Sequence, residues 1–498
     1  MRDRSRVPFV ALAVAVLLLA PTARAQRKPS DPSWWTKYQF LTKNGPDLPS
    51  GPSVSLSSGP NVDVSNECGP QSETFITIDP STPTNLAGGS NEIFRPPMRG
   101  YFSSDGGATW GGVDLPLPRP IGANGLTFGS DPTLAFDTGG NLFYGYIVVY
   151  VGHGNGINGT QLAVARSTDG GQTWPAVTFF GFEGGSNHFN DKPMIAADTN
   201  PASPFRDSIY LAWDAASGGS ASGGVRLARS TDHGATFTAT RIDDPTGPGR
   251  SIAADPFVGP GGELYVAWND WAANRIVFNR SFDGGVTWGR PHAIATKTAV
   301  FDVKIPAEFY RGALVYPACD TDRAPSSPYY GRLSCAFMDL TPAGTTDIFL
   351  ITSDDRGTTW STPAPVTDPL STPVDRFNQW LSVDPVTGDV NVSFYDTRND
   401  ATGFRYETDV YLARSTDGGE TFAPNVRVTS AKSNEHDCGG LFPCPAINYG
   451  NQQGDYSGLV AFDGTAYPIW TDSRRNQEVA TGCRTKLTME EVFTAAVK

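Results

Sequence analysis

Six side chains suited to acid–base chemistry stand beside segments that have the pattern of β-strands. They are Glu73, Asp131, Asp191, Asp396, Asp455 and Tyr456. Two carboxyl groups can act as general acid and base on a glycosidic bond. A tyrosine, with an ordinary pKa near 10, becomes a nucleophile only when a carboxylate accepts its proton. Asp455 adjoins Tyr456, but neighbours on a strand point to opposite faces, so we expect the helper among the other four carboxylates.

Basic and aromatic residues occupy similar places in the chain and could hold a sugar. An arginine can bind an acidic sugar through two hydrogen bonds, and a tryptophan can stack on a pyranose ring. We interpret six residues as candidate substrate-binding groups: Arg250, Arg376, Arg398, Arg474, Trp271 and Trp380.

A structural interpretation competes with this functional one. An aspartate follows an aromatic residue in one register in five units of the chain, at Asp214, Asp270, Asp339, Asp396 and Asp472. Such repetition is typical of a residue that caps a turn or bonds a neighbouring unit. By the same reasoning, Tyr456 could pack against the next unit and Asp455 could cap a connector.

The elements that must position these residues are set by a repeated eight-residue segment, which we name the box turn. Its pattern is Ser-x-Asp-x-Gly-x-Thr-Trp/Phe, and its aspartates are Asp105, Asp169, Asp232, Asp283, Asp355 and Asp417. Glycines allow positive φ, and the aspartate caps backbone N–H groups. The spacing of the copies suits the four-stranded blades of a β-propeller.

The chain contains seven candidate first strands but only six box turns. The first strands are predicted at 74–79, 133–137, 194–198, 252–255, 313–320, 381–384 and 459–463. The seventh unit ends after its third strand, at 491–497, and the segment 54–65 resembles a displaced fourth strand. Because an open edge leaves backbone groups unpaired, we predict an all-β fold of seven four-stranded blades closed by the N-terminal strand. Six blades is the alternative.

Six cysteines in a chain with an export signal are expected to form disulfides. Cys319 and Cys335 flank a predicted hairpin, where their side chains can meet. Loop placement on the ring further suggests the pairs Cys68–Cys483 and Cys438–Cys444. No Cys-x-x-Cys occurs and the chain has 5 His, so the spacing does not indicate zinc, and we expect neither a metal nor a cofactor.

The ends and composition of the chain predict its location. Residues 1–25 have arginines, an apolar run and the small-x-small site Ala23-Arg24-Ala25, as in a signal peptide. We expect 26–50 to be a linker, 51–498 to form the propeller, and the protein to be secreted or periplasmic. The net charge of −13 argues against nucleic acid as partner, and no later segment is apolar enough for a membrane span.

The box turns resemble the Asp-boxes of sialidases and related propellers, and the resemblance spans most of the chain. Tyr456-Ser457-Gly458-Leu459 is similar to the setting of the sialidase nucleophile. The family's Phe/Tyr-Arg-Ile-Pro motif is missing from the start of the first unit, and Phe94-Arg95-Pro96 is the nearest match. The resemblance implies an active site on the face away from the boxes, with three arginines, a tyrosine helped by a glutamate, and an aspartic acid/base.

From these observations we expect a secreted protein that binds an extracellular glycan or polysaccharide. If it is an enzyme, the resemblance implies a glycoside hydrolase of the exo-α-sialidase type. The alternative is a non-catalytic scaffold with an envelope protein as partner, like the seven-bladed Asp-box factors that assist assembly of membrane complexes. Carboxyl groups facing a common cavity would favour catalysis, whereas a channel filled with Asp–Arg pairs or bulky side chains would favour the scaffold.

Overall fold

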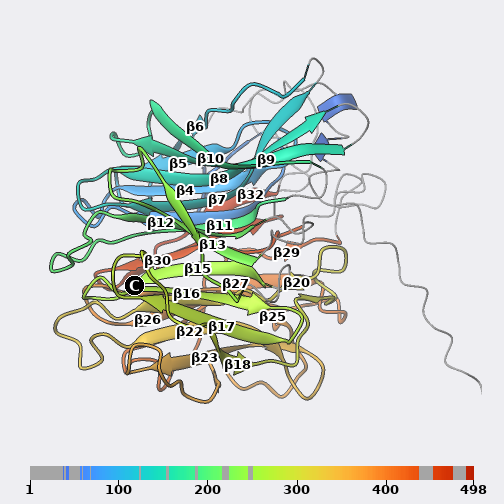
Figure 1. Cartoon of the computed structure of the whole chain (residues 1–498). Coiled ribbons are helices and arrows are strands. Elements are labelled where there is room, and N and C mark those ends of the chain that lie inside the picture. The colour runs from blue at the N-terminus through green and yellow to red at the C-terminus, as the bar shows by residue number, and fades with distance from the viewer. Residues whose placement is uncertain are drawn as a thin grey trace, which may run out of the picture.

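The chain forms a seven-bladed β-propeller in the computed structural model (Figure 1). The structure describes residues 37–38, 41–43, 56–58, 60–67, 69–122, 125–152, 156–185, 189–215, 224–244, 251–436, 452–474 and 490–498. Each blade is an antiparallel sheet whose first strand lies innermost, as the repeat predicts.

The first four blades follow the chain in order. The first blade consists of β3 (Gln71–Ile78), β4 (Leu86–Glu92), β5 (Arg99–Ser103) and β6 (Gly111–Asp114), and the second of β7 (Leu126–Phe136), β8 (Leu142–Gly152), β9 (Gly156–Ser167) and β10 (Ala176–Gly184). The third blade consists of β11 (Asp191–Ala197), β12 (Ile209–Ala215), β13 (Gly224–Ser230) and β14 (Thr238–Arg241). The fourth consists of β15 (Ser251–Val258), β16 (Leu264–Asp270), β17 (Arg275–Ser281) and β18 (His292–Thr296).

The last three blades complete the ring. The fifth blade consists of β21 (Ala318–Thr321), β22 (Leu333–Leu340), β23 (Thr346–Ser353) and β24 (Ala364–Pro365). The sixth consists of β25 (Arg376–Val383), β26 (Val390–Asp396), β27 (Glu407–Ser415) and β28 (Val426–Arg427), and β29 (Ser433–Asn434) also pairs with β27. The seventh consists of β30 (Leu459–Phe462), β31 (Thr465–Asp472) and β32 (Glu491–Thr494), together with β2 (Asn61–Asp63) and β1 (Leu56–Ser58) from the N-terminal part of the chain.

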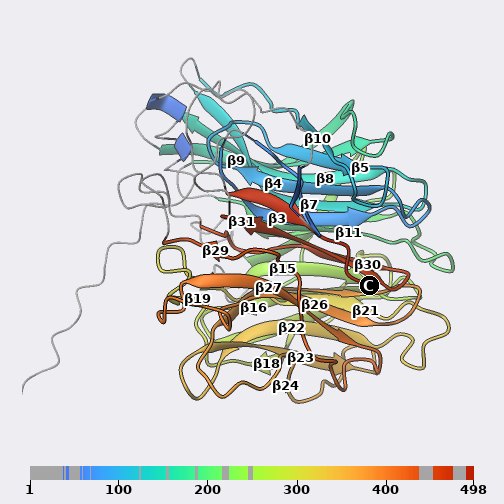
Figure 2. The same cartoon turned by 180° about the vertical axis from the view of Figure 1, so that it is seen from behind.

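The predicted seam between the termini is confirmed. In β2, Val62 pairs with Thr494 and Asp63 pairs with Phe493, so the N-terminal strand completes the seventh blade and β1 adds a fifth strand. Figure 2 shows β31 of this blade beside β3 of the first. The ring therefore has no open edge at the junction of its first and last blades.

The fifth blade departs from the prediction of one strand over 313–320. A short β20 (Ala313–Leu314) pairs instead with β19 (Asp302–Val303), and only β21 belongs to the blade. Pro317, between the two strands, has no N–H to donate, which explains the interruption.

The core lies between blades, because both faces of an inner strand are covered. In β8 the residues Tyr144, Tyr146 and Val148 join one apolar cluster, while Ile147 and Val149 join another. This alternation with a period of two is what a strand buried on both faces requires. Among the described residues, no helix is long and apolar enough to cross a membrane.

The six box turns share one set of hydrogen bonds, of which the turn at Ser103 is typical. Ser103 Oγ donates to Asp105 (2.8 Å), and Asp105 accepts from the backbone N–H and hydroxyl of Thr109 (2.9 and 2.6 Å). Partial burial of the Asp105 carboxyl group raises its pKa, but these hydrogen bonds outweigh that effect, so the pKa of Asp105 is lowered. The turns explain why the motif repeats, and they use no group of the candidate site.

The predicted disulfide Cys319–Cys335 is present and joins β21 to β22. The pairs Cys68–Cys483 and Cys438–Cys444 lie outside the described residues. Within the expected linker, residues 37–38 and 41–43 are helical. Lys37 is buried there and donates to the carbonyl oxygen of Gly129 (3.1 Å) in the second blade.

Candidate functional site

The innermost strands of five blades carry a β-bulge at the same level of the channel. At each bulge two residues of the innermost strand lie opposite one residue of the second strand, so the pairing shifts by one residue after Ser72, Ser130, Asp191, Ile252 and Phe377. The first unpaired residues, Glu73, Asp131, Lys192, Ala253 and Asn378, all have φ between 48° and 61°. Left-handed backbone is unfavourable for most of these residue types, and such strain clusters at functional sites. The bulges thus place charged side chains at one end of the channel.

Asp455, in the connector into the seventh blade, is the centre of this charged group. Its carboxylate accepts two hydrogen bonds from Arg311, from Nε (2.6 Å) and Nη2 (2.7 Å), and contacts the ammonium group of Lys192. Asp455 is only 1% exposed. Although burial opposes ionisation, Arg311 and Lys192 outweigh it and lower the pKa of Asp455.

Glu73 approaches the same guanidinium group. Its carboxyl oxygen is 4.0 Å from Arg311 Nη2, and it accepts a hydrogen bond from Asn91 Nδ2 (2.5 Å). Burial, together with the charges of Asp455 and Asp131, raises the pKa of Glu73 well above its ordinary value. Because both carboxyl groups contact one nitrogen, their separation does not exceed the roughly 5–10 Å found in glycosidases.

Asp131 and Asp191 add a second carboxyl pair. Asp131 accepts from the backbone N–H of Lys192 (3.2 Å) and from Ser130 Oγ (2.6 Å). Burial raises the pKa of Asp191 to about 7, and its hydrogen bond with Asp131 acts in the same direction. Four carboxyl groups therefore face two cations, Lys192 and Arg311, and the group is neutral when Glu73 and Asp191 are protonated. We name these six residues the channel cluster.

Tyr456 follows Asp455 in the chain and is 1% exposed. Its hydroxyl donates to the carbonyl oxygen of Pro132 (3.0 Å), and its ring packs against Tyr316 and Trp380. Burial, with the charges of Asp131 and Glu73, raises the pKa of Tyr456 well above its ordinary value, so its phenolate is harder to form. Trp380 is buried in the same packing rather than open to a ligand.

Sequence reasoning missed Arg311 and Tyr316, and for Tyr316 a signal was present. Glu73, Asp131, Lys192 and Asn378 each stand six residues before an aspartate that ends an inner strand, and Tyr316 stands six before Asp322. Arg311 has no such signal, because it belongs to the connector that the repeat does not include.

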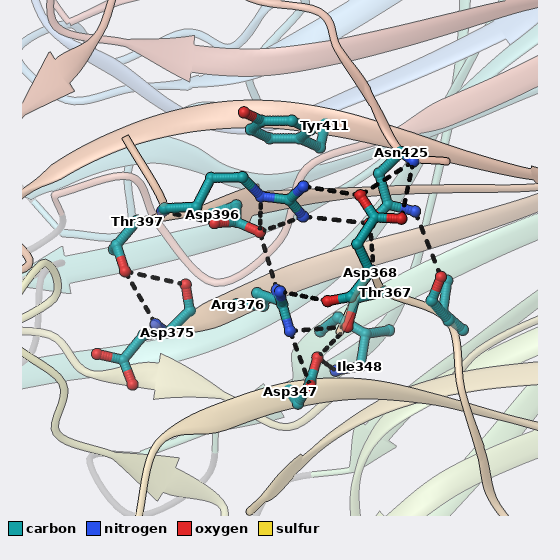
Figure 3. A network of polar contacts seen from close by, with 12 residues as sticks. Asp347, Ile348, Thr367, Asp368, Asp375, Arg376, Asp396, Thr397, Tyr411 and Asn425 are labelled. Carbon is teal, nitrogen blue, oxygen red and sulfur yellow. Dashed lines mark hydrogen bonds and ion pairs between the residues drawn. The ribbon is translucent and has the colours of Figure 1, made fainter. Parts of the chain in front are cut away.

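Asp396, Arg376 and Arg398 form a separate network between the fifth and sixth blades (Figure 3). Asp396 accepts from Arg376 Nε (2.9 Å) and is paired with Arg398 Nη2 (2.7 Å). Arg376 also contacts Asp347 (3.0 Å), and the guanidinium group of Arg398 stacks over Tyr411 (4.0 Å). Among the described residues, Arg376 and Arg398 pair with carboxylates of this network rather than with Glu73 or Asp455, so its charges are satisfied within the protein.

Arg474 repeats the arrangement of Arg398 in the next blade. Its backbone N–H and its guanidinium group both bind Asp472, and it lies over Phe493 at 4.3 Å. The other recurring aspartates also bind backbone: Asp214 accepts from Ala253 (3.0 Å), and Asp339 accepts from Ala299 (2.7 Å). The recurrence of these aspartates thus has a structural explanation.

Two candidates remain. Trp271 is 48% exposed at the end of the fourth blade's second strand, and Arg250 lies outside the described residues. In the part of the chain that the structure describes, no three His, Cys, Asp or Glu side chains are arranged to hold a metal ion.

A cavity of about 190 Å³ fills the channel between the channel cluster and the box-turn face. Innermost strands of all seven blades line it, with Asp255, Asp320 and Arg323 among its polar groups. Asp255 and Asp320 each accept a backbone N–H of the next blade, from Cys319 (2.6 Å) and Val383 (3.0 Å). These two carboxylates are therefore engaged in joining blades.

Comparison with known proteins finds similarity at the level of structure. No protein-family model and no curated protein sequence matches the chain. Sialidase-like propellers are similar at low identity. An intramolecular trans-sialidase from leech has 14% identity and a TM-score of 0.46, over 80% of this chain and 72% of that one.

Two other similar solved structures are those of an arabinanase and an ulvan lyase. An α-L-arabinanase from Penicillium chrysogenum has 14% identity and a TM-score of 0.42, over 74% of this chain and 93% of that one. An ulvan lyase has 13% identity and a TM-score of 0.43, over 86% of this chain and 94% of that one. At these values the likeness concerns the propeller architecture and says nothing of chemistry.

Proposed function

We propose that the protein is a secreted propeller that binds an extracellular glycan on its box-free face, the face opposite the box turns, and hydrolyses it at the channel cluster. The observation that supports this is the opposite displacement of two carboxyl pKa values around one arginine: Glu73 upward and Asp455 downward. Carboxyl groups whose pKa values are driven apart are suited to separate acid and base roles.

Under this proposal Glu73 is the general acid. Its raised pKa lets it keep its proton to higher pH than an ordinary glutamate, and it gives this proton to the glycosidic oxygen as the bond to the anomeric carbon breaks. Ionised Asp455 stabilises the positive charge that develops on the sugar. A water molecule then adds through its oxygen to the anomeric carbon and gives its proton to the Glu73 carboxylate, which restores the acid. Arg311, whose side chain is 24% exposed, is the member of the cluster that a substrate meets first.

A non-catalytic scaffold is the second candidate, and a specific observation favours it. Asp455 is already bound by two cations, and Tyr456 fills the channel between Tyr316 and Trp380. A plug of paired charges and bulky rings is what a scaffold requires to hold seven blades together. On this interpretation the exposed face binds an envelope protein.

A polysaccharide-hydrolysis screen on the purified chain distinguishes the two candidates. We expect release of reducing sugar from at least one glycan, and a loss in kcat of about 10²–10⁴-fold in Glu73→Gln, which cannot donate its proton in the same way. Glu420→Gln, on the box-turn face, serves as the control with unchanged activity. No hydrolysis across neutral and acidic glycans, or full activity in Glu73→Gln, would reject the enzyme.

The role of Tyr456 as nucleophile stays a prediction with its own test. Tyr456→Phe keeps the ring and removes only the hydroxyl group. Full activity in this variant would eliminate the nucleophile, whereas loss of activity with normal thermal stability would support it.

A further inference from the structure

Four aromatic rings form a continuous row on the box-free face. Phe309 lies against His436 with centroids 4.1 Å apart, His436 stacks on Tyr406 at 3.6 Å, and Tyr406 stacks on Phe404 at 5.4 Å. The His436 ring is fixed further by Nε2, which donates to the carbonyl oxygen of Pro306 (2.8 Å). We name these four residues the aromatic row.

Three separate segments build the aromatic row. Phe309 belongs to the connector into the fifth blade, Phe404 and Tyr406 to the loop between β26 and β27, and His436 to the connector into the seventh blade. Connectors into first strands and loops between second and third strands open on the face opposite the box turns. The row therefore does not follow from a local sequence pattern, and folding alone brings it together.

The two ends of the aromatic row are open to solvent. Phe404 is 64% exposed and Phe309 is 37% exposed, whereas the two middle rings are half-buried. Phe309 stands two residues from Arg311, and Gln452 accepts hydrogen bonds from the backbone N–H groups of Tyr310 and Arg311 (both 2.8 Å). This contact ties the row to the connector that contains Asp455.

We propose that the aromatic row is a stacking subsite for a polysaccharide chain whose end reaches Arg311. Aromatic faces bind the apolar faces of sugar rings. Because the rings of the row stack on one another, free aromatic faces remain at its exposed ends, Phe404 and Phe309, and these receive the sugar rings. A stable protein partner would instead need a broad patch of roughly 800 Å² on each side.

The charges around the aromatic row favour a neutral stretch of glycan. Lys304 pairs with Asp302 (3.3 Å), Arg405 with Asp375 (2.8 Å), and Lys432 with Glu407 (2.7 Å). Each nearby cation thus has its own carboxylate. This inference rests on the proposed function. It adds a binding site for the part of the glycan that lies away from the cleaved bond.

Affinity electrophoresis in gels containing soluble neutral polysaccharides tests the aromatic row without depending on catalysis. We expect Phe404→Ala to weaken the retardation constant roughly tenfold, because it removes the most exposed ring, and Phe404→Trp to preserve it. Phe282→Ala removes a ring of similar exposure, 53%, from a box turn and serves as the matched control. Thermal unfolding checks that each variant is folded.

The outcomes separate this inference from the proposed function. If the wild-type chain is retarded and Phe404→Ala is retarded equally, the subsite is wrong while glycan binding stands. If Phe282→Ala weakens retardation as much as Phe404→Ala, the binding is not specific to the row and the subsite is rejected. If no polysaccharide, neutral or acidic, retards the wild-type chain, the subsite and the proposed function both fail.

Discussion

At the scale of single residues, the channel cluster is a problem of charge balance. Four carboxyl groups and two cations are gathered in a region where an unpaired charge is costly. Protonation of Glu73 and Asp191 makes the group neutral, which agrees with the upward direction of both pKa values. The folded protein therefore keeps these two protons to higher pH than the unfolded chain does.

This retention gives a prediction for Asp191. Its pKa is about 7 in the folded protein, against 3.8 as the ordinary value, so the folded state binds more protons between these pH values. The stability that depends on this proton is complete below about pH 4 and is lost as pH rises through about 7, by at most about 4 kcal/mol and less where water reaches the side chain.

Urea unfolding at intervals from pH 4 to pH 8 measures this loss. We expect Asp191→Asn, which does not titrate, to have a smaller fall in the free energy of unfolding than the wild-type chain. Asp302→Asn, at a side chain that is 47% exposed, is the control and should follow the wild-type curve. Parallel curves for wild type and Asp191→Asn would contradict the prediction.

At the scale of the strand, the bulges are the feature that organises the site. Each leaves two residues unpaired in an innermost strand and sets the first in left-handed backbone. Propensity cannot explain the residues found there, because glutamate, lysine and alanine have no preference for positive φ. The arrangement is imposed by the sheet, at a local cost in strain.

Ala253 and Ala254 allow that strain to be measured. Both are fully buried, but only Ala253 has a positive φ, of 61°. Changing either to glycine removes one methyl group and frees the unfolded chain equally, so the difference isolates the backbone. We expect Ala253→Gly to be more stable than Ala254→Gly by about 1–2 kcal/mol, as measured by chemical unfolding. Equal stabilities would mean that the bulge carries no strain.

The sequence predicted elements better than side-chain partners. Repetition of the box turns and first strands located seven blades and the seam, and a hairpin located the Cys319–Cys335 disulfide. Asp396 and Asp455 were both predicted as catalytic candidates, yet the first binds Arg376 and Arg398 and the second binds Lys192 and Arg311. The direction of a side chain at a bulge depends on φ, and no residue pattern specified it.

At the scale of the whole molecule, the ring depends on residues that join its ends. Asn61, fully buried in β2, donates to the carbonyl oxygen of Val428 (2.9 Å) and accepts from the backbone N–H of Ser430 (2.6 Å). It also accepts from Arg474 (3.0 Å). One side chain thus connects the N-terminal strand to the sixth and seventh blades.

Asn61→Ala should therefore weaken the closure of the ring. It leaves the carbonyl oxygen of Val428, a buried residue, without its Asn61 donor, and an unpaired buried polar group costs about 1–3 kcal/mol. We expect a lower free energy of unfolding and faster amide exchange in β32, measured by hydrogen–deuterium exchange, with β12 unaffected. Asn141→Ala, in the hairpin of the second blade, is the control. Unchanged exchange in β32 would show that Asn61 does not hold the seam.

The pairing of β2 with β32 also bears on how the chain is made. Some 430 residues separate Asp63 from Phe493, so during synthesis the N-terminal strand waits for its partner until nearly the whole chain has emerged. Until then the flanks of the first and sixth blades, which the seventh covers in the finished protein, remain uncovered. Closure of the ring thus depends on the last blade: a chain truncated before residue 491 can form most of its sheets and still fail to become a ring.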